Sequence, residues 1–230
     1  MKTLGIVGGI GPESTVDYYR SLVQMWREQT KDESAPSILL NSIDLKKMLD
    51  LFAAKALAEV TVYLSGAMER LARAGADVGL FAANTPHIVF GELQRRSSIP
   101  LISIVEATRE AAEELGLRRL GLFGTRFTMQ GHFYADVFSK AGIALVVPEE
   151  NEQRYIHDIY MNELVKGVFL PETRQRLLAI ADRLAKQEHA QGLILAGTEL
   201  PLILREAACA IPFLDTTQIH VKAALRRLLS

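Results

Sequence analysis

Only one cysteine is present in this chain of 230 residues, so a disulfide framework and a cysteine-based zinc site are both excluded. Positive charge is not in excess either, because 26 Lys and Arg residues face 27 Asp and Glu residues. A formal net charge of −1 argues against a nucleic-acid partner. The five histidines have no close partner at metal-ligand spacing, so we expect no metal.

Long hydrophobic runs are missing as well. The longest ones, such as Val78 to Ala83 and Leu193 to Gly197, are far too short to span a bilayer. The chain enters a strand-like segment directly after Thr3, without a signal pattern. With 49% hydrophobic residues, the chain can fill a sizeable core. We therefore expect a soluble, cytoplasmic, globular protein with no membrane partner.

Short apolar runs alternate with helical patterns along the whole chain. Residues 55 to 74 and 172 to 186 each carry an apolar stripe at helical spacing. Strands that are apolar throughout and alternate with helices indicate a parallel sheet covered on both faces, an α/β fold. The predicted strands are residues 4–7, 37–40, 78–82, 101–104, 120–123, 144–147, 193–195 and 211–214.

Two segments recur half a chain apart, which suggests two similar domains. Residues 4–9 resemble 120–125, and residues 79–85 resemble 192–198. A chance likeness between buried strands is the alternative explanation. We predict a first α/β domain made of residues 1–99 plus 209–230 and a second made of 100–208, with the last helix returning to the first domain.

A glycine-rich turn follows the first predicted strand and opens a helix at Pro12. Backbone N–H groups at such a helix end suit a carboxylate or phosphate, which makes Gly9 and Gly11 candidate ligand contacts. The turn lacks the third glycine of a dinucleotide fingerprint, and the chain contains no P-loop. Residues 124–129 repeat the strand–turn–helix pattern in the second half.

Several motifs together resemble the aspartate/glutamate racemase family. They are Gly8-Gly9-Ile10-Gly11-Pro12, Asn84-Thr85-Pro86-His87, Gly124-Thr125 with Thr128-Met129, Asn162 to Gly167, and Thr198-Glu199-Leu200-Pro201. The resemblance covers nearly the whole chain. It implies two pseudo-symmetric α/β domains with the ligand cleft between them, a homodimer, no cofactor, and an amino acid or dicarboxylate as the small-molecule partner.

The resemblance also implies a mechanism in which two residues, usually cysteines, flank the α-carbon. Inversion needs one base to take the α-proton and one acid on the opposite face to return it. In this sequence the two cysteine positions are Ala83 and Gly197, whose side chains cannot move a proton. Candidate replacements are His87, Thr198 and Glu199. The single thiol, Cys209, is interpreted as a buried structural residue.

The residues that resemble the family's substrate contacts are better preserved. Asn84 and Thr85 correspond to contacts of the substrate's carboxylate and amino group, and Lys166 corresponds to the lysine that meets the distal carboxylate. Asp44 is interpreted as a turn or cap residue. The complete predicted substrate-binding set is Gly9, Gly11, Ser42, Asn84, Thr85, Thr125, Thr128, Thr198 and Lys166.

Three functions stay open on this basis. The first is a cofactor-independent amino-acid racemase, an isomerase of the aspartate/glutamate type. The second is a non-catalytic homologue that binds an amino acid or dicarboxylate. The third is a different reaction on the same scaffold, such as decarboxylation or cis–trans isomerisation, and it ranks last because those relatives also rely on at least one of the cysteines.

Overall fold

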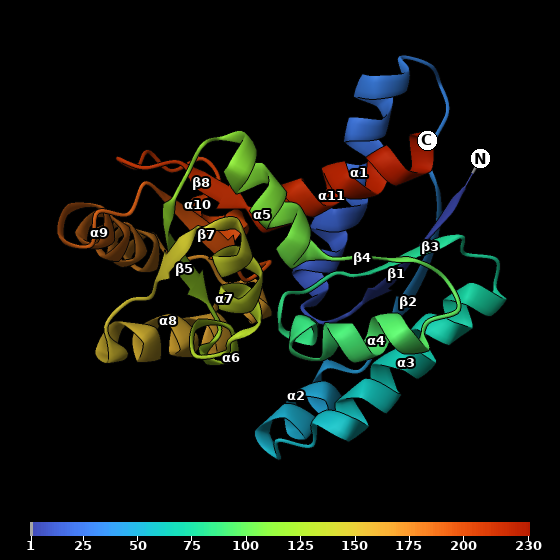
Figure 1. Ribbon diagram of the computed structural model, residues 1–230, viewed down its shortest axis with the longest axis horizontal. Helices are drawn as coiled ribbons and strands as arrows, with labels where there is room; N and C mark the ends of the chain where they lie inside the picture. Colours follow the sequence, from blue (N-terminus) through green and yellow to red (C-terminus); the bar gives the residue numbers. More distant parts are fainter. Residues whose placement is uncertain (1) are drawn as a thin grey trace. The chain divides into compact units, whose positions relative to one another are not determined.

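A computed structural model describes residues 2–230 and divides the chain into two compact units (Figure 1). The first unit runs to Ser103 and includes His220–Ser230, and the second unit is Ile104–Ile219. Each unit contains one parallel sheet of four strands with helices around it. The α/β class with two similar halves is therefore confirmed.

The sheet of the first unit has the order β2-β1-β3-β4, so β1 is paired on both sides. Its strands are β1 (Thr3–Gly8), β2 (Ser37–Ser42), β3 (Val78–Phe81) and β4 (Leu101–Ile102). Its helices are α1 (Pro12–Thr30), α2 (Leu45–Ala53), α3 (Leu57–Arg73), the 3-10 helix η1 (Thr85–Val89) and α4 (Phe90–Arg96), and the C-terminal part of α11 (Thr216–Leu229) joins them.

The sheet of the second unit repeats this order as β6-β5-β7-β8. Its strands are β5 (Arg119–Gly124), β6 (Ala144–Val146), β7 (Gly192–Ala196) and β8 (Phe213–Asp215). Its helices are α5 (Ile104–Glu114), α6 (Arg126–Met129), α7 (Phe133–Phe138), α8 (Glu150–Asn162), α9 (Pro171–Gln187) and α10 (Leu200–Leu204), with the 3-10 helices η2 (Ser139–Ala141) and η3 (Leu164–Lys166).

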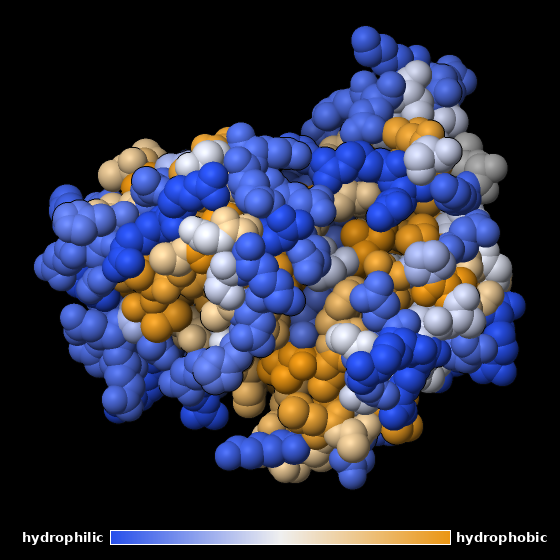
Figure 2. Space-filling model, viewed as in Figure 1, coloured by the Kyte–Doolittle hydropathy of each residue, from blue (hydrophilic) through white to orange (hydrophobic). Residues whose placement is uncertain are grey.

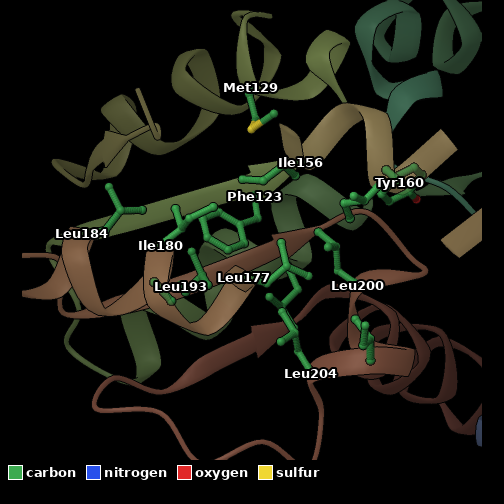
Figure 3. Close-up of a cluster of buried hydrophobic side chains, with 14 of the residues drawn as sticks. Phe123, Met129, Ile156, Tyr160, Leu177, Ile180, Leu184, Leu193, Leu200 and Leu204 are labelled. Carbon is green, nitrogen blue, oxygen red and sulfur yellow. The ribbon is translucent and has the colours of Figure 1, made fainter. Parts of the chain in front are cut away.

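The second unit buries both faces of its sheet, as the uninterrupted apolar strands predict. Alternate residues of a strand point to opposite faces. Phe123 and Leu193 pack with α8 and α9 in one core cluster (Figure 3), whereas Leu122 and Ile194 pack with α5 and α7 in another. This double cover explains why these strands are recognisable in the sequence as continuous apolar runs.

The two recurring sequence segments occupy equivalent places in the two sheets. The first pair lies on β1 and β5, the strands that are second in their sheets, and the second pair lies on β3 and β7 beside them. In both units the paired strands are parallel, so their carboxyl ends share one edge. The recurrence therefore reflects two units of the same topology.

The unit boundaries differ from those suggested by the sequence, which were 99/100 and 208/209. Leu101 and Ile102 pair with β3 and so belong to the first sheet. Residues 213–215 pair with β7, which keeps the chain in the second unit as far as Ile219. The end of α11 then packs in the first unit, where His220 Nδ1 lies 2.9 Å from the Tyr18 hydroxyl.

Asp44 caps α2, in agreement with its interpretation from the sequence. Its side chain accepts hydrogen bonds from the backbone N–H groups of Lys46 (2.8 Å) and Lys47 (3.3 Å). Replacing such a cap with alanine typically costs about 1 kcal/mol. We expect Asp44→Ala to lower the free energy of unfolding in urea by about this amount. Asp44→Asn, which keeps an acceptor oxygen, should restore most of it, and equal losses in both variants would contradict the capping role.

Within residues 2–230, none of the helices combines the length and the apolar character needed to cross a bilayer.

Candidate active site

The residues that sequence analysis selected in the first unit follow the carboxyl ends of its strands. Val7 pairs with Phe81, so the chain leaves β1 at Gly9 and β3 at Ala83 from the same edge. Ala83 and Asn84 are buried, and Thr85 begins η1. Gly8 pairs with Ser42 at the end of β2, which brings Ser42 to Gly9. The sequence-predicted residues of this unit therefore gather along one sheet edge.

The glycine-rich turn differs from the expected open anion site. Gly9 and Gly11 have φ values of +78° and +94°, which L side chains rarely adopt. The Gly9 N–H, however, donates to the Thr15 hydroxyl at 2.9 Å, and that hydroxyl donates to the Gly11 carbonyl at 3.0 Å. The Gly9 amide is thus used to hold the turn against the start of α1.

His87 is buried and neutral. Its Nδ1 lies 3.2 Å from the Asn84 carbonyl oxygen, and its ring stacks on Phe90 with centroids 4.7 Å apart. Burial, with a smaller contribution from the charge of His220, lowers the pKa of His87 to about 3. A neutral imidazole of such low pKa is a weak base at neutral pH.

In the second unit, the position that the family resemblance assigns to the second cysteine is covered by an aromatic ring. Gly197 follows β7 directly, and Tyr160 of α8 lies over it. A Cβ atom built at Gly197 would stand 2.4 Å from Cε2 of Tyr160 and 3.1 Å from its hydroxyl oxygen. Real Cβ atoms do not approach a carbon so closely, so the Tyr160 ring takes up the space of a side chain at position 197.

The Tyr160 hydroxyl donates a hydrogen bond to Oε2 of Glu199. Thr198 Oγ1 donates to the same oxygen at 3.2 Å. All three side chains are buried, and Glu199 is 0% exposed. Burial, followed by the negative charge of Glu199, raises the pKa of the Tyr160 phenol well above its ordinary value of 10. The phenol is therefore held in its protonated form, pointing at a carboxylate.

The other predicted substrate-binding residues of the second unit are Thr125, Thr128 and Lys166. Thr125 follows β5, whose last residue pairs with Ala196, so the chain leaves β5 and β7 at one edge. The hydroxyls of Thr125 and Thr128 lie 3.3 Å apart, and both residues are buried. Lys166 ends η3 and is exposed. Cys209 is half-buried rather than fully buried, with Sγ 4.0 Å from Asp182 Oδ1.

A separate apolar groove lies between α2 and α3 of the first unit and has a volume of about 610 Å³. Leu51, Ala58 and Val62 line it, and Lys47 Nζ lies 4.6 Å from the centre of the Tyr63 ring beside it. Figure 2 shows apolar surface in this region. None of the residues selected from the sequence lines this groove.

A comparison with protein families shows to which family this chain is related. A family model described as Asp/Glu/Hydantoin racemase matches residues 7–224. The chain belongs to this family. As a member of the Asp/Glu/Hydantoin racemase family, it has homologues that are amino-acid racemases, which are isomerases.

Relatives agree with this assignment over the full length. A broad-specificity amino-acid racemase, RacX of Bacillus subtilis, is 23% identical over 227 residues, which cover 96% of each chain. Two solved structures share 31% identity and cover 100% of both chains. One, from Yersinia pestis, is provisionally described as an Asp/Glu racemase and has a TM-score of 0.90. The other is an aspartate racemase homologue from Pyrococcus horikoshii, with a TM-score of 0.87.

Tyr160, which lies over Gly197, is a candidate site residue that the sequence did not indicate. It follows Ile156 and Ile159 on the buried stripe of α8 and so has the spacing of an ordinary core residue. A signal was nevertheless present: a glycine at a position where the family resemblance predicts cysteine leaves a space that some larger side chain must fill. The sequence does not reveal which side chain does so.

Proposed function

We propose that this chain removes and returns the α-proton of an amino acid, with the carboxylate of Glu199 taking over work that thiols do in the family. The observation that carries the proposal is the fully buried Glu199, two residues after Gly197, with its Oε2 hydrogen-bonded by Tyr160 and Thr198. Burying a carboxylate is unfavourable unless it is hydrogen-bonded. The phenol that donates to it has a raised pKa, and groups with perturbed pKa values gather at functional sites. His87, with its pKa lowered to about 3, is a weaker candidate for the base.

The proposed substrate is a dicarboxylic amino acid such as aspartate or glutamate. Lys166 is exposed and offers an ammonium group for a distal carboxylate. Gly9 is left out of the proposed contacts, because its N–H donates to Thr15. The remaining residues keep the contact roles that the family resemblance gives them, namely Gly11, Ser42, Asn84, Thr85, Thr125, Thr128 and Thr198.

Three further points belong to the proposal and rest on the family resemblance. The reaction proceeds without pyridoxal phosphate or another cofactor, the protein is a homodimer, and it acts in the cytoplasm. Activity of dialysed protein tests the first point, sedimentation velocity tests the second, and cell fractionation tests the third.

The decisive experiment follows the α-proton signal of L- and D-aspartate and L- and D-glutamate by proton NMR in D₂O. We expect the wild-type protein to exchange this proton for deuterium on at least one of the four. Because general acid–base groups contribute about 10²- to 10⁴-fold to rate, Glu199→Gln should slow exchange at least about 100-fold. Exchange should be unchanged in Glu172→Gln, which removes an exposed carboxylate of the same unit.

The absence of exchange with all four amino acids would overturn the proposal. If one of them then still raised the melting temperature, the protein would be a binding homologue on a racemase scaffold. If Glu199→Gln exchanges the α-proton at the wild-type rate, the reaction occurs but does not need Glu199.

A further inference from the structure

We infer that the Tyr160 hydroxyl is the group that exchanges a proton with the substrate's α-carbon in place of the missing thiol at position 197. This inference rests on the proposed α-proton chemistry and names the residue that contacts the reacting atoms. Its basis is the contact between Tyr160 and Gly197, which are 37 residues apart in sequence and which the fold brings together.

The first argument is spatial. A thiol at position 197 would be bonded to a Cβ atom, and the Tyr160 hydroxyl oxygen lies 3.1 Å from the place of that Cβ. The ring edge itself lies closer, at 2.4 Å, so the ring and a side chain at 197 exclude each other. Tyr160 therefore places a phenol hydroxyl close to where a cysteine at position 197 would place its thiol.

The second argument is the direction of the hydroxyl. A tyrosine that served only as filling would be expected to bury its ring and satisfy its oxygen with a backbone group or water. Here the ring lies at the edge of the apolar cluster and the oxygen is directed away from the other labelled side chains (Figure 3). Its partner is a buried carboxylate, Glu199, which an apolar filling role does not require.

The third argument is chemical. A phenol, like a thiol, can both donate and accept a proton, although its ordinary pKa is higher by about 1.5 units. When the substrate's α-C–H bond breaks, the proton passes to the Tyr160 oxygen while the proton of Tyr160 moves to Oε2 of Glu199. The substrate becomes a carbanion and the carboxylate becomes a neutral acid, so protons and charge balance. In the return direction Glu199 gives a proton to Tyr160 while Tyr160 gives one to the carbanion. Exchange of this pair with solvent before the return places deuterium on the α-carbon in D₂O.

Thr198 fits this relay as a positioning residue. Its hydroxyl donates at 3.2 Å to the Glu199 oxygen that also accepts from Tyr160. This second donor stabilises the carboxylate while it holds no proton, and it restricts the rotation of the Glu199 side chain.

The test compares α-proton exchange in the wild type, Tyr160→Phe and Tyr134→Phe. Tyr160→Phe keeps the ring over Gly197 and removes only the oxygen, so exchange should fall at least about 100-fold. Tyr134→Phe is the matched control, because it removes another fully buried tyrosine hydroxyl of the same unit. It should exchange at the wild-type rate.

A second measurement is needed because Tyr160→Phe also loses the buried hydrogen bond to Glu199. Incorporation of 3-fluorotyrosine at position 160 keeps the ring and the hydroxyl but lowers the pKa of the phenol. We expect the pH profile of exchange to move to lower pH, which a purely structural role would not produce. Glu199→Gln combined with Tyr160→Phe should be no slower than either single variant, since the two groups form one relay.

The outcomes separate this inference from the proposed function. Exchange in the wild type that persists in Tyr160→Phe, or a pH profile unaffected by fluorination, overturns the role of Tyr160 and leaves the α-proton chemistry with Glu199. A wild type that exchanges nothing overturns both.

Discussion

Replacing Gly197 alone with cysteine is expected to destabilise the protein by about 3 kcal/mol. The new Cβ would stand 2.4 Å from Cε2 of Tyr160, inside a packed cluster that also contains Ile156, Leu200 and Leu204. Inserting extra atoms into a packed core costs about 1 to 3 kcal/mol. Moving the ring aside would also break its bond to Glu199 and leave a buried carboxylate with fewer donors, a further loss of about 1 to 3 kcal/mol.

The measurement is the free energy of unfolding from urea denaturation of Gly197→Cys, Tyr160→Leu and the double variant. Removing the ring opens the space that the cysteine needs, so the double variant should be more stable than the sum of the two single effects predicts, by at least about 1 kcal/mol. Additive effects would show that the ring and position 197 do not compete for space.

Gly66→Ala provides a control for replacing a glycine. Gly66 lies inside α3, and a Cβ there would meet only Arg70 Nη1, at 3.9 Å. Because glycine within a helix is less favourable than alanine by about 0.5 to 1 kcal/mol, this variant should gain stability. A gain at Gly66 with a loss at Gly197 would show that the loss comes from the surroundings of Gly197 and not from replacing a glycine as such.

The pairing of Gly197 with Tyr160 explains how a glycine is accommodated at the position to which the family resemblance assigns a cysteine. Deleting a side chain from a packed interior normally leaves a cavity, which costs stability. Here the ring of Tyr160 fills the place, and the site contains a hydrogen-bonded phenol and carboxylate instead of a void. Two residues far apart in sequence are thus matched to each other in space.

How much of this could be predicted from the sequence depends on the range of each interaction. All eight strands were predicted, because buried parallel strands carry uninterrupted apolar residues. Strand ends were shifted by one or two residues, and β4 and β8 crossed the predicted unit boundaries because pairing to β3 and β7 decides their membership. The cap at Asp44 was also predicted, since capping acts within three residues.

The environment of the site could not be predicted in the same way. Nothing local indicates that the Gly9 amide is already bonded to Thr15, because that depends on the turn geometry set by two positive φ angles. The burial of His87, which lowers its pKa, depends on packing against Phe90 and α11. Tyr160 contacts position 197 only through the packing of α8 on the sheet. The strand-end motifs indicate a candidate site, whereas the surroundings of its side chains depend on long-range packing.

The second large effect is a loss of stability in mild acid that originates in the first unit. His220 is buried between the Tyr18 hydroxyl and the Ile102 carbonyl, and burial lowers its pKa to about 4. The pKa of buried His87 is lowered to about 3. In the unfolded chain both imidazoles have the ordinary value of 6.5. Between pH 6.5 and these low values the unfolded state binds more protons than the folded state, so stability falls as the pH falls.

At pH 5 each imidazole should contribute a loss of about 2 kcal/mol relative to pH 7. Urea unfolding at the two pH values measures the sum, and His220→Gln should reduce the difference by about 2 kcal/mol even if it lowers stability at pH 7. His132→Gln, at an exposed position, should leave the difference unchanged. If both His220→Gln and His87→Gln still lose the wild-type amount of stability between pH 7 and pH 5, other groups cause the acid sensitivity. The titrating histidines lie in the first unit, whereas Glu199 and Tyr160 lie in the second. Wild-type exchange activity could therefore fall below pH 6 in parallel with unfolding. If His220→Gln does not show this fall, the loss of activity reflects the stability of the fold and not the proton relay.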